Sequence, residues 1–259
     1  MTLSDTAALV ALIAATGIAL DASEILRGRR ELAQFFSWRT MARYQRGRLA
    51  RLGAKWPALA DRVVWTIVAL HAVAAAAAAY VLAYGDAWMA APLAGFVVAV
   101  RILLDHRFPF SIIGADHMQV VVWIALILFS LSGEIGQKAA LLFIGGHGVL
   151  AYLTTGFAKL KKKPWRDGTA VSHVMQSTTF GTPRLAAALP MRVVSPAVTW
   201  ATLAFEMAGP FLILLGPEGA LVFCGTAVLF HSGIAVTMGL TPFLFAFAST
   251  HPAIYWLAT

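Results

Sequence analysis

The chain has 259 residues, of which 59% are hydrophobic and 12% are charged, and its formal net charge is +8. Globular chains average about 45–50% apolar and about 25% charged residues, so a water-soluble protein of this length could not bury so much apolar surface. The composition predicts an all-α, polytopic transmembrane bundle, and together with the lone Cys224 it excludes a cytosolic enzyme, a disordered chain and a secreted disulfide scaffold.

Apolar segments long enough to cross a bilayer follow one another along the chain. A hydrocarbon core of ~30 Å needs about 20 helical residues. With this length the predicted spans are 6–26, 63–84, 87–105, 117–133, 138–158, 197–216, 219–240 and, as an eighth, 242–258. The eighth is interrupted by His251 and Pro252, so seven and eight spans both stay open. We expect one integral membrane domain over residues 1–259, in a bacterial inner membrane.

A basic segment, residues 27–62, follows the first predicted span. It holds ten of the 20 Lys and Arg residues, Arg43 and Arg46 among them, with Trp38 and Trp56 interleaved. This pattern is typical of a surface that contacts anionic membrane lipids, and a solvated basic loop is the alternative. Nucleic acid is not an expected partner, because the basic residues are not spread over a polar domain.

A second polar connection, residues 159–196, contains another basic run at 161–166. Cytoplasmic loops of membrane proteins carry an excess of Lys and Arg. An even number of predicted spans, four, separates the two basic stretches, so both can lie on the cytoplasmic side.

Ionisable residues inside spans are costly and therefore informative. Arg101 and Asp105 are four residues apart on one helix, which favours an intrahelical ion pair. His71 is predicted to be a neutral core histidine. Two less favoured alternatives stay open. Histidines on three spans (His71, His147, His231) could bind a b-type haem, and Asp116, His117 and Glu206 could form a metal site.

Glu206 lies deep in the segment LAFEMAGPFL, where a carboxylate needs a cation or a proton. Candidate partners are Lys159, His117, His147 and His231. Lys159 ends a span and is either a base, since low dielectric disfavours its charged form, or an interfacial lysine whose amine reaches toward water.

The stretch YLTTGFAKLKKKPWRDGTAV, residues 152–171, resembles a signature of the vitamin K-dependent gamma-carboxylase-like family, also called horizontally transferred transmembrane (HTTM) proteins. The matching positions are Tyr152, Gly156, Lys159, Leu160, Trp165, Asp167 and Gly168. The segments IIGADHMQVVVWIAL, LAFEMAGPFLILL and LFHSGIAVTMGL are similar to other spans of that family.

The resemblance implies that Lys159 is the base that deprotonates a vitamin K-like quinol and that His117 supports it. Glu206, His231, His147 and Asp116 would be supporting groups around this site. Full carboxylases carry a large C-terminal domain outside the membrane and work on the non-cytoplasmic face. This chain ends at Thr259, so we expect a minimal bacterial-type member without propeptide-directed carboxylation.

Two functions follow as hypotheses. The first is a quinol-linked membrane enzyme that abstracts protons or adds oxygen, acting on a peptide or a small molecule with a possible redox partner. The second is a non-catalytic subunit or maturation factor that binds lipid, haem or a partner protein. The first hypothesis is favoured because a lipophilic quinol can enter from the bilayer and meet a partly desolvated amine.

Overall fold

The computed structural model describes residues 1–39, 41, 48–108 and 114–259, so Arg43 and Arg46 of the basic segment lie outside the described residues. Within those ranges the regular structure is helical and contains no strand, which confirms the all-α prediction. The long helices are α1 (Leu3–Arg27), α5 (Pro57–Tyr84), α6 (Ala90–Arg107), α7 (Gly114–Leu131), α8 (Glu134–Leu160), α12 (Met191–Ala208) and α13 (Pro217–Met238).

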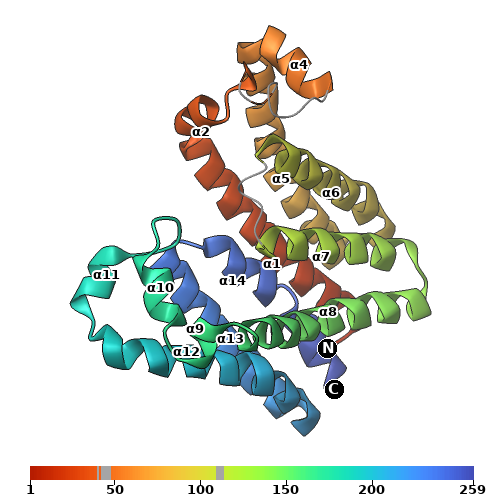
Figure 1. Cartoon of the computed structure of the whole chain (residues 1–259). Helices are drawn as coiled ribbons and strands as arrows, with labels where there is room; N and C mark the ends of the chain where they lie inside the picture. The colour runs from red at the N-terminus through yellow and green to blue at the C-terminus, as the bar shows by residue number, and fades with distance from the viewer. Residues whose placement is uncertain (40, 42–47, 109–113) are drawn as a thin grey trace.

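Shorter elements connect the long helices or follow them (Figure 1). They are α2 (Arg29–Phe35), α4 (Arg48–Lys55), α9 (Lys163–Arg166), α10 (Ala170–Gln176), α11 (Pro183–Ala188), α14 (Thr241–Ala248) and α15 (His251–Leu257). Two 3-10 helices, η1 (Ala87–Met89) and η2 (Gly209–Leu215), begin the third span and end the sixth.

Seven helical segments of the described chain are long and apolar enough to cross a membrane, and the protein is therefore an integral membrane protein. Six of the seven begin earlier than the predicted apolar runs, and the difference is largest in α5 and α12. α5 begins at Pro57 instead of residue 63, and α12 begins at Met191 instead of residue 197. The reason is that a helix can continue beyond the hydrocarbon, whereas hydropathy detects only its apolar part.

The predicted eighth span is a broken helix. α14 has eight residues and α15 has seven, so neither is long enough to cross a bilayer at 1.5 Å per residue. Ser249 and Thr250 lie at the break, and their hydroxyls donate to the carbonyls of Ala246 and Phe247. α14 packs against α1, α7 and α13, and α15 packs mainly against α8.

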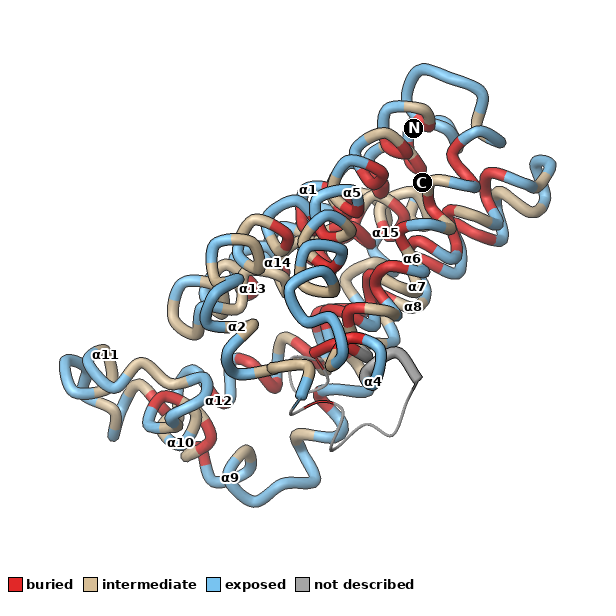
Figure 2. Tube along the Cα trace, turned by 90° about the horizontal axis from the view of Figure 1, so that it is seen from above, coloured by how far each residue is buried: buried red, intermediate tan, exposed pale blue. Residues whose placement is uncertain are grey.

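The two ends of the bundle differ in what they carry. One end, the terminal end, holds both termini and the tight connections at residues 85–86 and 132–133. The other, the basic end, holds α2, α4 and α9 to α11. Figure 2 shows the termini and α9 to α11 at opposite extremes, with the buried positions running along the long helices between them.

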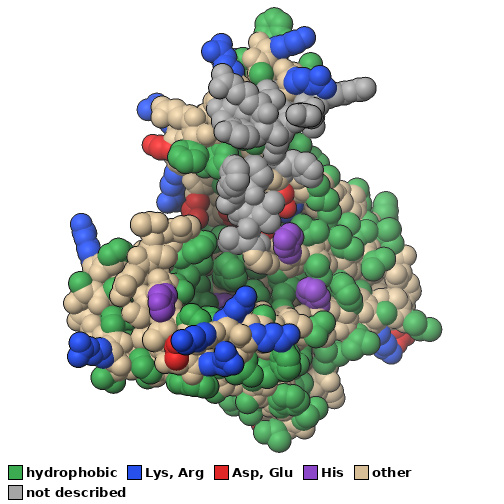
Figure 3. Space-filling model, in the orientation of Figure 1, with side chains coloured by type: hydrophobic (Ala, Val, Ile, Leu, Met, Phe, Trp, Pro, Cys, Tyr) green, Lys and Arg blue, Asp and Glu red, His purple; other side chains and the backbone are tan. Residues whose placement is uncertain are grey.

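Small side chains let the central helices approach closely. The alanine-rich part of α5, including Ala75 and Ala78, packs against α1 around Ala11 and Ala14, and all four are fully buried. Close approach of backbones through small residues is the usual way in which membrane helices associate. Large apolar side chains lie on the outside (Figure 3), where lipid would cover them.

Candidate functional site

Lys159 and Glu206 form an ion pair between the last turn of α8 and the last turn of α12. The Lys159 Nζ donates to Glu206 Oε1. The lysine side chain is 21% exposed and the glutamate side chain only 4% exposed, so the pair has one reachable end and one buried end. This confirms the prediction that Glu206 is shielded and has a polar partner, and it selects Lys159 from the four candidates.

A glycine explains why the two helices come close enough for this pair. A Cβ added at Gly156 would lie 3.1 Å from the Glu206 Cβ and 2.9 Å from the Met207 Sδ. Gly156 is one turn before Lys159, on the same face of α8. On that face Gly145 and Gly148 likewise contact the region of α15, and a Cβ at Gly148 would lie 2.6 Å from the Thr250 Oγ1.

The last residues of the predicted motif, Trp165, Asp167 and Gly168, lie in the turn that follows α8. The Trp165 ring covers the Lys159 amine, with Nζ 4.7 Å from the ring centroid. Asp167 accepts hydrogen bonds from the Thr169 hydroxyl at 2.6 Å and the Thr169 backbone N–H at 3.1 Å, and these bonds hold the pKa of the Asp167 carboxyl below its usual value. Asp167 is exposed and organises the turn.

Gly168 ties the same turn to the helix that carries Glu206. Its φ of 79° lies in the left-handed region that favours glycine, and its carbonyl accepts hydrogen bonds from Ser195 at 2.8 Å and Thr199 at 3.3 Å on α12. The motif therefore ties the end of α8, which carries Lys159, to α12, which carries Glu206.

A second buried polar pair lies deeper on the same face of α8. The Tyr152 hydroxyl is 3.1 Å from the His231 Nε2, and both side chains are buried. Aromatic rings surround the pair, with Phe205, Phe223 and Phe247 at centroid distances of 5.2–5.5 Å from Tyr152. His231 therefore lies in the core and contacts the tyrosine of the motif, not Lys159.

Buried polar atoms without partners accumulate around these two pairs. Among the described residues, Glu206 Oε2, His231 Nδ1 and His251 Nε2 have no hydrogen-bond partner. His251 was expected only as a break in the last apolar segment, and its burial depends on α15 folding back against α8. Of these atoms, the carboxylate oxygen of Glu206 has lone pairs that can accept a proton.

The predicted partners of Lys159 separate into other environments. Asp116 accepts from Arg101 at 2.6 Å, together with Asp21 at 2.8 Å and Asp105 at 3.2 Å, so it belongs to a different cluster. The Arg101–Asp105 pair was predicted, but the contributions of α1 and α7 were not.

The three other histidines lie apart from the pair. His117 is exposed at the start of α7, and in the described part of the chain it forms no hydrogen bond with Lys159. His147 is half-buried against Phe143, and His71 is buried in α5. Over the described ranges no group of three or more His, Cys, Asp or Glu side chains is arranged to hold a metal ion.

The arrangement offers proton chemistry at a membrane boundary. A partly exposed amine is joined to a buried carboxylate that retains one free oxygen, and an indole lines the approach. Comparisons of the chain with protein-family models, with curated proteins and with solved structures found no match, so its function has to be inferred from these residues and their geometry.

Proposed function

We propose that this protein is a membrane enzyme that removes a proton from a lipophilic quinol, with Lys159 and Glu206 as its acid–base centre. The observation that carries the proposal is the Lys159–Glu206 pair itself, which is open at the amine and closed at the carboxylate. The resemblance of residues 152–171 to the carboxylase-like signature adds the expectation that the acid is a quinol.

The pair works as a relay. Lys159 passes a proton to Glu206 and takes the proton of the substrate hydroxyl in its place, so the O–H bond breaks and the proton is held on the carboxyl. The ammonium remains beside the oxygen that gains negative charge, where a fixed positive charge is most useful. The buried carboxylate can accept the proton because burial disfavours its charged form.

The residues fit a quinol. Glu206 Oε1 already accepts a hydrogen bond from Lys159 and takes the proton in the relay, and Oε2 has no hydrogen-bond partner in the described chain. The Trp165 ring beside the amine provides an aromatic wall for a flat ring. A bound quinol would supply the electrons for reaction with oxygen, and a redox partner would have to reduce it again.

A structural ion pair in a non-catalytic subunit is the second candidate, because the amine is satisfied by Glu206 in the same way in either case. The two candidates differ in what conservative substitutions do. Lys159→Arg keeps the pairing but cannot pass on a proton, and Glu206→Gln keeps the volume but cannot receive one. A structural pair tolerates Lys159→Arg, whereas a relay fails with either substitution.

The test uses purified protein in lipid nanodiscs, with menadiol as the quinol and oxygen consumption as the readout. We expect consumption above that of protein-free nanodiscs, falling about 10²–10⁴-fold in Lys159→Arg and in Glu206→Gln. The matched control is Lys138→Arg, in the exposed Lys138–Glu134 pair near the start of α8, which should keep the full rate. Full activity in both site variants, or none in the unaltered protein, would overturn the proposal.

The localisation belongs to the same proposal. A quinol pool and positively charged loops on the cytoplasmic side are typical of a bacterial inner membrane. We place the basic end of the bundle, and with it Lys159, at the cytoplasmic boundary of such a membrane. A peptide or a small molecule that enters there would be the second substrate.

A further inference from the structure

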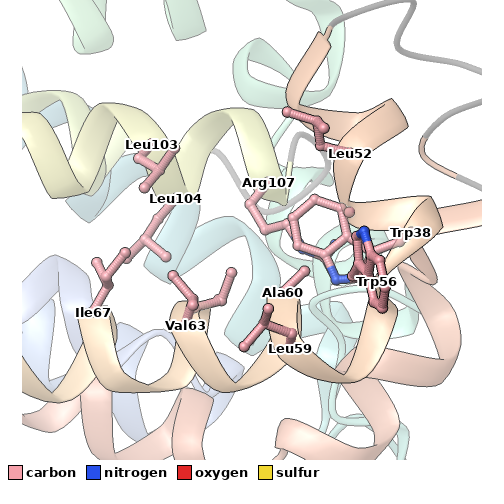
Figure 4. A pocket seen from close by; sticks show the side chains of 12 residues that line it. Trp38, Leu52, Trp56, Leu59, Ala60, Val63, Ile67, Leu103, Leu104 and Arg107 are labelled. Atoms are coloured by element: carbon pink, nitrogen blue, oxygen red, sulfur yellow. The ribbon is translucent and has the colours of Figure 1, made fainter.

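An apolar pocket lies at the basic end of the bundle, between α4, α5 and the end of α6 (Figure 4). Its volume is about 320 Å³, which is at the lower end of the range of small-molecule sites. Figure 4 shows the aliphatic side chains of Ile67, Val63 and Leu104 at one end and the side chains of Arg107 and Trp38 at the other. The pocket is thus apolar along its length and cationic at its tip.

Arg107 is the unusual member of this lining. Its guanidinium is buried, with the residue 5% exposed, and its Nε, Nη1 and Nη2 have no hydrogen-bond partner among the described residues. The nearest carboxylate is Asp61, 3.7 Å from Nη2, and the same Asp61 Oδ1 accepts a 2.7 Å hydrogen bond from the Trp38 indole. Burial lowers the pKa of Arg107 despite this carboxylate.

Aromatic rings hold the guanidinium in place without satisfying it. Its central carbon lies 4.3 Å from the centroid of Trp38 and 4.8 Å from that of Phe108. Stacking on rings occupies the faces of the guanidinium and leaves its N–H groups directed outward in the plane, where they match a phosphate or a carboxylate. A buried cation with unused hydrogen-bond donors is costly unless an anion pairs with it and accepts those hydrogen bonds.

The position of the pocket indicates where that anion comes from. Leu52, Trp56 and Leu59 line the pocket and are largely exposed, so it opens toward the lipid-facing surface. Trp56 lies just before α5, and indoles favour the headgroup level of a bilayer. Several lining residues come from the segment 27–62, whose sequence is basic, and basic segments of this kind attract anionic lipid.

We propose that this pocket binds one anionic phospholipid, whose phosphate pairs with Arg107 and whose acyl chain lies along the walls formed by Val63, Ile67 and Leu104. The lipid then supplies the acceptors that the guanidinium lacks, and it ties α4 to the ends of α5 and α6. This site is separate from the Lys159–Glu206 pair and does not depend on the proposed enzyme activity.

The experiment measures thermal stabilisation of the detergent-solubilised protein by phosphatidylglycerol, with phosphatidylcholine of the same acyl chains as the neutral comparison. A ligand that binds the native state raises the midpoint in a concentration-dependent way, which yields an apparent Kd. We expect phosphatidylglycerol to raise the midpoint and phosphatidylcholine to leave it unchanged. Arg107→Gln should raise the apparent Kd for phosphatidylglycerol about 30-fold or more, the usual effect of removing one partner of a buried charge pair.

A second variant tests the walls while the cation stays. Ala60→Phe fills the pocket and keeps Arg107, so it decides the matter even where Arg107→Gln fails to fold. Arg166→Gln, an exposed charge at the same end, is the control and should keep the Kd of the unaltered protein. An unchanged Kd in Ala60→Phe or in a folded Arg107→Gln would overturn the proposal, as would full stabilisation by glycerol 3-phosphate without acyl chains.

Discussion

Arg101 joins three helices through three carboxylates. Its guanidinium contacts Asp21 on α1, Asp105 on its own helix and Asp116 on α7, and its side chain is 11% exposed. Each charge would be costly if buried alone, so the cluster is stable only as a unit. It fixes the relative positions of α1, α6 and α7 near the basic end.

Replacement of Arg101 by Gln should therefore destabilise the protein by about 3–5 kcal/mol, because it leaves several carboxylates buried without a cation. Asp105→Asn should cost about 1 kcal/mol or less, because two other carboxylates still pair with the arginine. Thermal unfolding in detergent, monitored by tryptophan fluorescence, measures both. Equal losses in the two variants would contradict the cluster.

Sequence spacing could reveal only part of these contacts. Arg101 and Asp105 are four residues apart, and helix geometry alone predicts their pairing. Lys159 and Glu206 are 47 residues apart, and the prediction that Glu206 needs a cation left four candidates. Asp21 and Asp116 acquire their shared partner, Arg101, from tertiary packing, which has no local signal.

At the scale of elements, α8 is the helix that organises the candidate site. Its buried face carries Gly145, Gly148, Tyr152, Gly156 and Lys159 in succession. The glycines bring α12 and α15 close, and the two polar residues then meet Glu206 and His231. Backbone approach and polar contact thus depend on the same stripe of residues.

Two glycines of α8 provide a matched comparison. Gly156→Leu should destabilise by about 1–3 kcal/mol, because the new side chain meets Met207 and Glu206 and forces α8 and α12 apart. A Cβ added at the exposed Gly146 meets nothing within 4 Å, so Gly146→Leu should be neutral or stabilising by up to about 1 kcal/mol. The midpoint of thermal unfolding measures both effects. Similar shifts in the two variants would show that close approach of the helices at Gly156 is not needed.

Hydropathy predicted the long helices well and the irregular ones poorly. An apolar run identifies a span because lipid requires every backbone group to be satisfied within the helix. The break between α14 and α15 was foreseen only as an interruption at His251 and Pro252. Its fold depends on the hydroxyls at 249 and 250 and on space beside Gly148, which hydropathy does not record.

The whole molecule is electrically polarised. Among the described residues, Lys138 is the one Lys or Arg near the terminal end, and the others lie toward the basic end. In Figure 3 blue side chains lie at the top, along the left edge and in a group at the lower centre of the molecule. From this asymmetry the positive-inside rule predicts an orientation in which the basic end faces the cytoplasm.

Cysteine labelling tests that orientation, on a background in which Cys224→Ser removes the single native thiol. With a membrane-impermeant maleimide added to intact cells, Asp86→Cys and Gly133→Cys should react, and Arg30→Cys and Arg166→Cys should react only after permeabilisation. The reverse pattern would invert the topology, and labelling of Arg30→Cys without Arg166→Cys would contradict the common side of the two basic segments.

The central claim is that the Lys159–Glu206 pair takes up a substrate proton. Infrared difference spectroscopy of the protein in nanodiscs, recorded as menadiol is added without oxygen, observes this directly. We expect a protonated-carboxyl band in the unaltered protein that is lost in Glu206→Gln and in Lys159→Arg, and kept in Lys138→Arg. No such band in the unaltered protein, or a band that persists in Glu206→Gln, would contradict the claim.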